Sequence, residues 1–254
     1  MENNNQLFSI ETYSKRRALL KKKVIGSGVL LFLGNQESSI NFKDNWYPYR
    51  QDSTFLYYFG LNLPGLHALI DLDSGQEIIF GDDLTLDEIV WTGSQPTIAV
   101  MSAKVGILDI RPLEKITTCL FKRGVHFLPV YRPEHAVLMA SLLDLSYTEI
   151  DLGYSVPFIK AVAAQRSVKS PEELSSLHEA ASITSQIHLS LMQEAKAGMK
   201  EYELASRVRQ VAHEQNVNIS FQPIVTIDGQ ILHNHYYGNT LSGGDLLLCD
   251  AGAE

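Results

Sequence analysis

The sequence predicts a mixed α/β (α+β) protein with two domains. Two observations carry this prediction. Short apolar segments, several of them bounded by glycine, alternate with short helical patterns over roughly the first 150 residues, which is typical of a domain built on a sheet. Two long amphipathic helical patterns then follow, and a length of 254 residues allows either one large domain or two ordinary ones.

Composition indicates a soluble protein with a buried core. Hydrophobic residues make up 45% and charged residues 20% of the chain, and the net charge is −8. A negative net charge gives a nucleic-acid partner no general electrostatic support. No apolar run approaches the roughly 18 residues that a membrane span needs, and the polar N-terminus lacks the order of a signal peptide. Nucleic acids and membranes are therefore not expected as partners.

Cysteine usage points to a reducing compartment. The chain has two cysteines, Cys119 and Cys249, which lie far apart and form no CxxC motif. This argues against a disulfide framework and favours a cytoplasmic protein.

The first domain is expected to begin with a helix over residues 9–24. Six of the nine residues from Lys15 to Lys23 are basic, which we interpret as a solvated helix face rather than a nuclear-import or anionic-surface patch. A further short helix is expected at 84–90. The "DSG" turn predicts that two of the expected strands form a hairpin. The strands are expected at 28–34, 67–72, 76–81, 97–101 and 125–131.

The second domain is expected to open with helices over 155–170, 170–198 and 200–215. Ser170 and Glu173 form an S-x-x-E capping box around Pro171, and Gly198 is well placed to end that helix. Its apolar face is predicted to contain Leu174, Leu177, Ala181, Thr184, Ile187 and Leu191. Strands are expected at 221–229 and 245–250. We place the domains at 1–155 and 156–254.

Histidines and one acid near the C-terminal end are the candidate functional residues. His233 and His235 precede the last predicted strand, and Asp250 ends that strand 17 residues after His233. A carboxylate at a strand end suits a divalent cation, because the strand holds a hard oxygen ligand in place. Spacing alone favours Asp250 as a turn-capping acid over a metal ligand, and it also allows the two histidines to be solvated. No further ligands follow at a recognised zinc spacing.

Five motifs in order resemble the Xaa-Pro aminopeptidase (aminopeptidase P) family, which belongs with prolidase, creatinase and methionine aminopeptidase. The N-terminal half carries two of them and the C-terminal half three. They are "YPYRQDSTFLYYFGL" (47–61), "EIVWTG" (88–93), "RSVKSPEELSSLHEAASIT" (166–184), "GMKEYELA" (198–205) and "ILHNHYYGNTLSGGDLLLCDAGAE" (231–254). The last is the most specific, because the family places a histidine before Asp-Ala-Gly by the same interval.

The resemblance implies a fold and a chemistry. It implies a creatinase-type N-terminal domain followed by the first part of a "pita-bread" metallopeptidase domain. Asp250 would be the first metal ligand, and His233 would be a catalytic residue that contacts the substrate and stabilises the tetrahedral intermediate. Two divalent cations, expected to be Mn²⁺, would activate a hydroxide that cleaves the bond before proline. His235 departs from better-known members and remains either a substrate-binding residue or a solvated one.

The family also needs an aspartate, a histidine and two glutamates that lie beyond Glu254. One carboxylate cannot hold two dications, so residues 1–254 alone are expected neither to retain the metals nor to hydrolyse peptides. We therefore expect the chain to be the N-terminal part of such an enzyme. A prolidase-type dipeptidase and a non-catalytic peptide- or protein-binding member of the same fold remain alternatives. The expected substrate is a peptide with proline in second position, and a homodimer or homotetramer is plausible.

Overall fold

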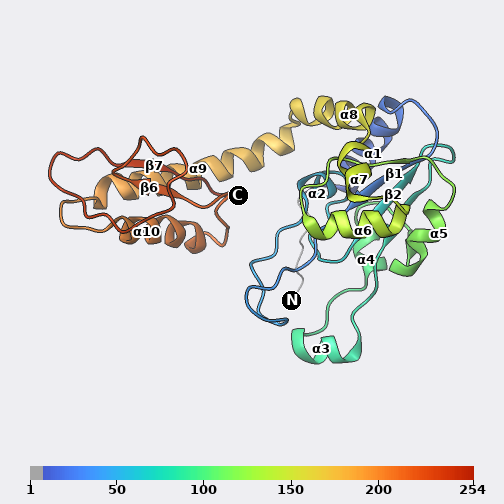
Figure 1. The fold of residues 1–254 in the computed structure, drawn as a ribbon, viewed down its shortest axis with the longest axis horizontal. Coiled ribbons are helices and arrows are strands. Elements are labelled where there is room, and N and C mark those ends of the chain that lie inside the picture. Colours follow the sequence, from blue (N-terminus) through green and yellow to red (C-terminus); the bar gives the residue numbers. More distant parts are fainter. Residues whose placement is uncertain (1–7) are drawn as a thin grey trace. The chain divides into compact units, whose positions relative to one another are not determined.

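The computed structural model describes residues 8–254. The chain divides into two units between Val168 and Lys169, and each unit is described by itself (Figure 1). The elements of the first unit are α1 (Ile10–Lys23), β1 (Val29–Leu33), α2 (Ser53–Phe59), β2 (His67–Asp71), β3 (Glu77–Phe80), α3 (Leu86–Thr92), α4 (Ile98–Ala103), β4 (Asp109–Arg111), the 3₁₀ turn Leu113–Lys115, α5 (Ile116–Leu120), β5 (Val125–His126), α6 (Pro133–Leu143), α7 (Tyr147–Leu152) and α8 (Val156–Ser167). Those of the second are α9 (Pro171–Glu194), α10 (Glu201–Glu214), β6 (Ile224–Thr226) and β7 (Leu248–Asp250).

A five-stranded mixed sheet with the order β4-β3-β2-β1-β5 forms the centre of the first unit. The pairs β1–β2 and β2–β3 are antiparallel, and β3–β4 and β1–β5 are parallel. The predicted hairpin between β2 and β3 is confirmed. Because β1 and β2 are buried along nearly their whole length, their sequences read as continuous apolar runs rather than as an alternation.

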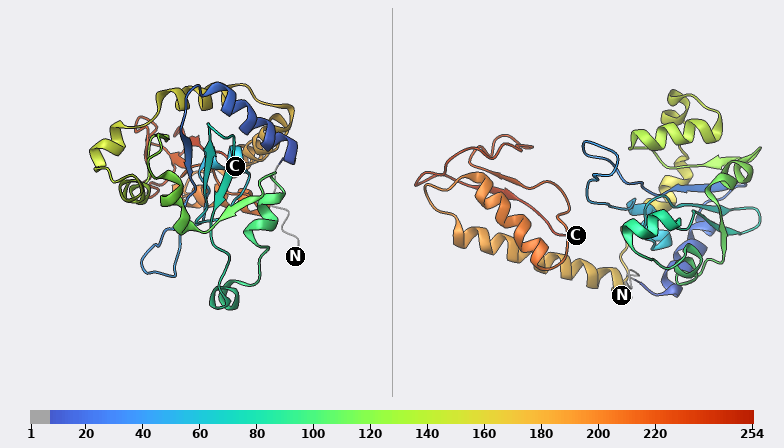
Figure 2. Two further views of the ribbon diagram at one scale, coloured as in Figure 1. Left: turned by 90° about the vertical axis from the view of Figure 1, so that its right-hand side faces the viewer. Right: turned by 90° about the horizontal axis from the view of Figure 1, so that it is seen from below.

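Helices cover both faces of this sheet (Figures 1 and 2). Alternate strand residues point to opposite faces, so Leu30 and Phe32 pack with α1, α2 and α8, whereas Val29 and Leu31 pack with α5, α6 and α7. The ring of Phe32 meets that of Phe158 on α8 edge to face, at a centroid distance of 5.1 Å. The unit is therefore a three-layer α/β/α arrangement, and the predicted mixed α/β class is confirmed.

The helix α8 belongs to the first unit by its contacts. The Gln165 side chain donates from Nε2 to the Arg16 carbonyl at 2.9 Å, and the Tyr58 hydroxyl donates to Gln165 Oε1 at 3.1 Å. We expected residues 156–168 in the second domain, whereas these contacts tie them to α1 and α2.

Two strand predictions for the first unit were wrong in part. Residues 97–101 begin the helix α4 instead of a strand, because the Thr97 side chain accepts a hydrogen bond from the Val100 amide and starts the helix. The strand expected at 125–131 is reduced to Val125–His126, because only these two residues pair with β1. The helix expected at 84–90 lies two residues further on, as α3.

The solvated-face interpretation of the basic helix α1 was also wrong in part. Lys15, Lys22 and Lys23 are exposed, but Arg16 and Arg17 are buried. Arg16 stacks over Tyr57, with its guanidinium carbon 4.0 Å from the ring centroid. These two arginines can be buried because their guanidinium groups have partners there. Carbonyl groups and aromatic rings come from α2, and the carboxylate of Glu77 comes from β3.

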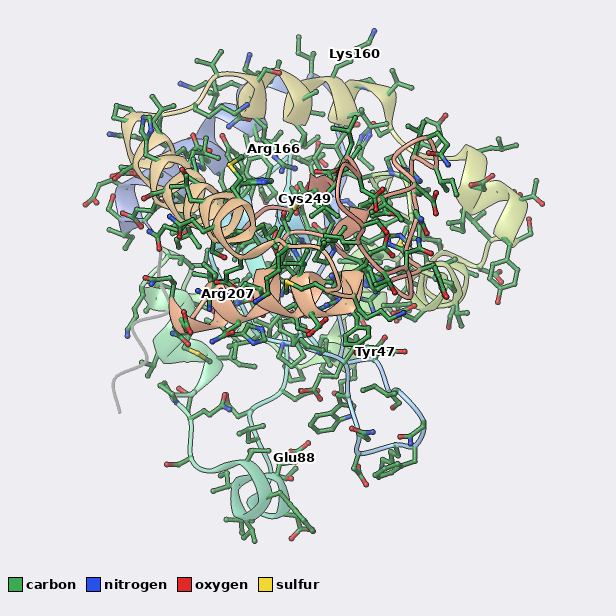
Figure 3. The ribbon with its side chains drawn as sticks, turned by 90° about the vertical axis from the view of Figure 1, so that its left-hand side faces the viewer. Tyr47, Glu88, Lys160, Arg166, Arg207 and Cys249 are labelled. Atoms are coloured by element: carbon green, nitrogen blue, oxygen red, sulfur yellow. The ribbon has the colours of Figure 1, made fainter. Side chains whose placement is uncertain are left out.

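The helix α3 stands on an arm of the first unit, away from the sheet; Glu88, labelled in Figure 3, lies on it. None of its residues is buried, and Trp91 is 88% exposed. The helix begins with a local capping box, in which Thr85 and Glu88 form reciprocal hydrogen bonds.

The second unit packs α9 and α10 together and against the antiparallel pair β6–β7. The capping box of Ser170 and Glu173 is confirmed. The predicted apolar face of α9 was wrong in its first half: Ile187 and Leu191 are buried, but Leu174 and Leu177 are 46% and 51% exposed. The α9 residues that share a hydrophobic core with α10 are Ile183, Ile187 and Leu191, all in its C-terminal half. The helix ends at Glu194, before Gly198.

Candidate metal centre

Asp250 is the last residue of β7, and its side chain is exposed. In the β6–β7 pair Asp250 lies opposite Ile224, Cys249 opposite Val225, and Leu248 opposite Thr226. Val225 and Cys249 belong to the core that α9 and α10 cover. Since successive strand residues point to opposite faces, Asp250 lies on the face of the pair turned away from these helices.

The strand before Asp250 differs from the expectation. We predicted a buried strand from residue 245, but pairing begins at Leu248, and Leu246 is 90% exposed. The pair has two strands of three residues each, and on its outer face Leu248 is 40% exposed, whereas Ile224 is buried.

The histidine loop, residues 229–240, attaches to that same face. Asn234 is buried, and its Nδ2 atom donates to the Thr226 hydroxyl at 3.0 Å. Its Oδ1 atom accepts from the Tyr236 amide at 3.0 Å. Thr226 shares a face of β6 with Ile224, which lies opposite Asp250. We call the hydrogen bond between Asn234 and Thr226 the histidine-loop anchor. The anchor and Asp250 therefore lie on one face of the pair, two strand residues apart, which is about 7 Å along the strand.

His233 and His235 flank the buried Asn234, and both are exposed. Within residues 8–254, neither imidazole makes a hydrogen bond or an ion pair, and the same holds for the Asp250 carboxylate. The arrangement thus presents two imidazoles and one carboxylate whose nitrogen and oxygen atoms are open to an external group.

These donors suit a divalent cation in kind but not in number. Carboxylate oxygen and imidazole nitrogen are common ligands for manganese and related metals. The carboxylate oxygens of Asp250 are not taken by protein donors, so a cation could approach them. However, the described part of the chain contains no group of three or more His, Cys, Asp or Glu residues placed to hold a metal.

Cys249, labelled in Figure 3, precedes Asp250 in the chain but is not a candidate ligand beside it. Burial raises the pKa of its thiol to about 11, and the negative charge of Asp250 adds to this increase. Cys249 also packs in the core that α9 and α10 cover, on the face of the pair opposite to Asp250.

Two residues that position the histidine loop were not predicted. Asn234 lies between His233 and His235, and only the two histidines were considered as candidate functional residues. Glu201 lies within the motif "GMKEYELA", and its position at the start of an amphipathic helix reads as an ordinary helix-start acid. Only the tertiary structure shows that Glu201 is fully buried and bonded to the far end of the loop.

Comparison with known proteins agrees with this architecture. Residues 13–125 match the aminopeptidase P N-terminal domain, and residues 175–254 match metallopeptidase family M24. The chain is 27% identical over 260 residues to the Xaa-Pro aminopeptidase of Escherichia coli K12, covering 96% of this chain and 58% of that one. It is 24% identical over 260 residues to the human Xaa-Pro dipeptidase, covering 98% and 52%.

Solved structures show the same fold. Zinc-substituted E. coli aminopeptidase P in complex with product superimposes with a TM-score of 0.81 at 25% identity, over 97% of this chain and 60% of that one. Aminopeptidase PepP of Pseudomonas aeruginosa gives 0.81 at 20% identity, over 97% and 59%. The chain thus spans a little more than half the length of these relatives.

The fold is that of the solved aminopeptidase P structures. More particularly, residues 13–125 match the aminopeptidase P N-terminal domain, and residues 175–254 match metallopeptidase family M24. The resemblance to the Xaa-Pro aminopeptidases that the sequence motifs indicated is confirmed.

Proposed function

We propose that this chain is part of a metal-dependent Xaa-Pro aminopeptidase, which removes the N-terminal residue that precedes proline in a peptide. The observation that carries the proposal is the shared placement of Asp250 and of the histidine-loop anchor on one face of β6–β7. The matches to the aminopeptidase P and M24 families support it.

In this proposal Asp250 is a metal ligand and His233 is a catalytic residue. Two divalent cations, proposed to be Mn²⁺, would supply an activated water and charge stabilisation for the oxyanion. Asp250 would hold one cation with an oxygen that no protein donor occupies. The exposed His233 imidazole would contact the substrate and donate a hydrogen bond to the tetrahedral intermediate. His235 would contact the substrate beside it.

We further propose that residues 1–254 alone do not retain two cations and do not hydrolyse peptides. One aspartate leaves most of the charge of two dications without neutralising ligands. The absence of a three-residue metal cluster within residues 8–254 supports this proposal.

We also propose that the protein lies in the cytoplasm and acts on a peptide substrate. It is proposed to self-associate into a dimer or tetramer. The free thiols of Cys119 and Cys249 support a reducing compartment. Among residues 8–254, no helix combines the length and the apolar composition needed to cross a bilayer.

Substrate and metal assays test the proposal on the protein expressed from its complete reading frame. With Mn²⁺, it should cleave Xaa-Pro-Xaa tripeptides, and Asp250→Asn should abolish both Mn²⁺ binding and cleavage. Asp245→Asn, an exposed acid five residues earlier, is the matched control. Exclusive cleavage of Xaa-Pro dipeptides would instead support a prolidase-type enzyme, which the similarity to the human dipeptidase favours as second candidate. Tight peptide binding without cleavage, unchanged by removal of Mn²⁺, would support a binding module.

A further inference from the structure

Glu201 is a fully buried acid outside the predicted site. It is the first residue of α10, and none of its surface is exposed. Within the described chain, Glu201 forms no ion pair with an arginine or a lysine. A buried carboxylate needs compensation, and here backbone and side-chain N–H groups provide it, together with the positive end of the α10 helix dipole.

The hydrogen bonds of Glu201 join the two ends of the histidine loop. Its Oε1 atom accepts from the Ile227 amide at 2.8 Å, just after β6, and from Asn239 Nδ2 at 3.1 Å. Its Oε2 atom accepts from the Asn239 amide at 3.3 Å. Asn239 Nδ2 also donates to Asp228 Oδ2 at 3.1 Å, which ties the two loop ends to each other. We call Glu201, Ile227 and Asn239 the loop base.

The backbone around Glu201 supports the same loop end. The Glu201 amide donates to the Asn239 carbonyl at 3.1 Å, and the Tyr202 amide donates to the Tyr237 carbonyl at 3.0 Å. Lys200 Nζ donates to the Gly238 carbonyl at 3.1 Å. The start of α10 is therefore bonded directly to the chain that leaves the histidines.

A carboxylate is the side chain that this position requires. All three hydrogen bonds to its oxygens come from N–H donors, and an ionised carboxylate is acceptor-only. A glutamine would turn its own N–H₂ group toward one or more of these donors. Asn239 or Ile227 would then lose an acceptor, and the side-chain link between the two loop ends would be broken, although the backbone hydrogen bonds from the start of α10 remain.

We propose that Glu201 is a positioning residue for the histidine loop: its buried carboxylate fixes the loop ends, and through them His233, for the reaction. The proposal rests on the proposed function only in assigning His233 to the chemistry. In the described part of the chain, Glu201 makes no hydrogen bond or ion pair with either histidine, and it acts through Asn239 and Ile227.

Hydrogen exchange on the 254-residue chain tests the structural half without any activity. Glu201→Gln should speed amide exchange in residues 229–240 by about tenfold or more, whereas protection in the rest of α10 stays in place. Glu214→Gln removes the same charge from the exposed last turn of α10 and should change nothing. Asn239→Ala deletes the loop side of the base, and it keeps the test informative if Glu201→Gln unfolds the second unit. Unchanged exchange of the loop in both variants would overturn the proposal.

Kinetics on the protein expressed from its complete reading frame test the positioning half. Glu201→Gln and Asn239→Ala should lower kcat per metal-loaded molecule by about 10–100-fold, while KM and Mn²⁺ content stay near those of the unmodified protein. Because both variants act on one loop base, the double variant should lose little more than either single variant. A purely structural role would lower the folded fraction and leave kcat per folded molecule unchanged, which would overturn the proposal.

The two proposals fail in distinguishable ways. If the unmodified protein cleaves no Xaa-Pro peptide but the loop exchanges faster in Glu201→Gln, the proposed function fails and the loop base stands. If the unmodified protein is active and Glu201→Gln leaves both kcat and loop exchange unchanged, the positioning role fails and the function stands.

Discussion

The Nε atom of Arg17 donates to Oε2 of Glu77 at 2.7 Å, and no part of the arginine side chain is exposed. The guanidinium also donates to the carbonyls of Tyr58 and Val105, at 2.9 and 2.8 Å. Burial lowers the pKa of Arg17, and the charge of Glu77 opposes that change. This pair joins α1, α2, β3 and the segment after α4.

Removing one member of the pair is expected to destabilise the first unit strongly. Arg17→Leu leaves two buried carbonyls without their donor and leaves Glu77 paired with Lys21 alone, and Glu77→Gln leaves a buried guanidinium without its counter-charge. Each change should cost about 3–5 kcal/mol, because an uncompensated buried charge or polar group remains. Urea denaturation measures this cost. Lys22→Leu, an exposed site on α1, should stay within about 0.5 kcal/mol; a similarly small cost for Arg17→Leu would contradict the prediction.

His67 is expected to make stability depend on pH. Burial and then the nearby charge of His135 lower its pKa to about 4, from 6.5 in an unfolded chain. Between these pH values the unfolded state binds more protons than the folded state, so stability rises with pH. The contribution of about 3 kcal/mol is complete above pH 6.5 and is lost as the pH falls toward 4.

Urea midpoints between pH 4 and 7 measure this dependence. His67→Gln should flatten it, since glutamine keeps an acceptor for the Gly34 amide but does not titrate. The matched variant is His178→Gln, which changes an exposed histidine. An equally steep profile in His67→Gln would mean that other groups, such as His135 with its lowered pKa, carry the dependence.

The Ser170 cap is expected to hold the start of α9. Ser170 Oγ accepts from the Glu173 amide at 3.2 Å, and Glu173 Oε2 accepts from the Ser170 amide at 2.8 Å. Ser170→Ala should cost about 1 kcal/mol and speed exchange in the first turn. Ser175→Ala, an exposed position inside the helix, should have no such effect, and equal exchange in the two variants would refute the role of the cap.

The two histidines are expected to differ in kinetics and not in stability. In the protein expressed from its complete reading frame, His233→Ala should lower kcat about 100-fold or more, because proton and hydrogen-bond donation at the reacting group is lost. His235→Ala should act mainly on KM. Since both side chains are exposed, neither change should alter the free energy of unfolding by more than about 0.5 kcal/mol. A larger loss of kcat in His235→Ala would reverse the two assignments.

Local pattern was sufficient where local forces decide the structure. The capping box at Ser170 and the hairpin between β2 and β3 were predicted, because each depends on residues close together in the chain. The interval between His233 and Asp250 likewise indicated the family. In contrast, the strand expected at 97–101 became a helix, because Thr97 caps it and no strand of the sheet pairs with it.

The sequence by itself determined the mixed α/β class, the long helices α1, α9 and α10, the β2–β3 hairpin and the family, because these follow from periodicity, turn residues and motif order. Only the tertiary structure decided which polar groups are buried. Arg17 was taken for a solvated cation and Glu201 was not singled out, yet both are fully buried. Their partners lie 60 and 38 residues away in the chain. Compensation of a buried charge depends on these distant donors and acceptors, which no local pattern contains.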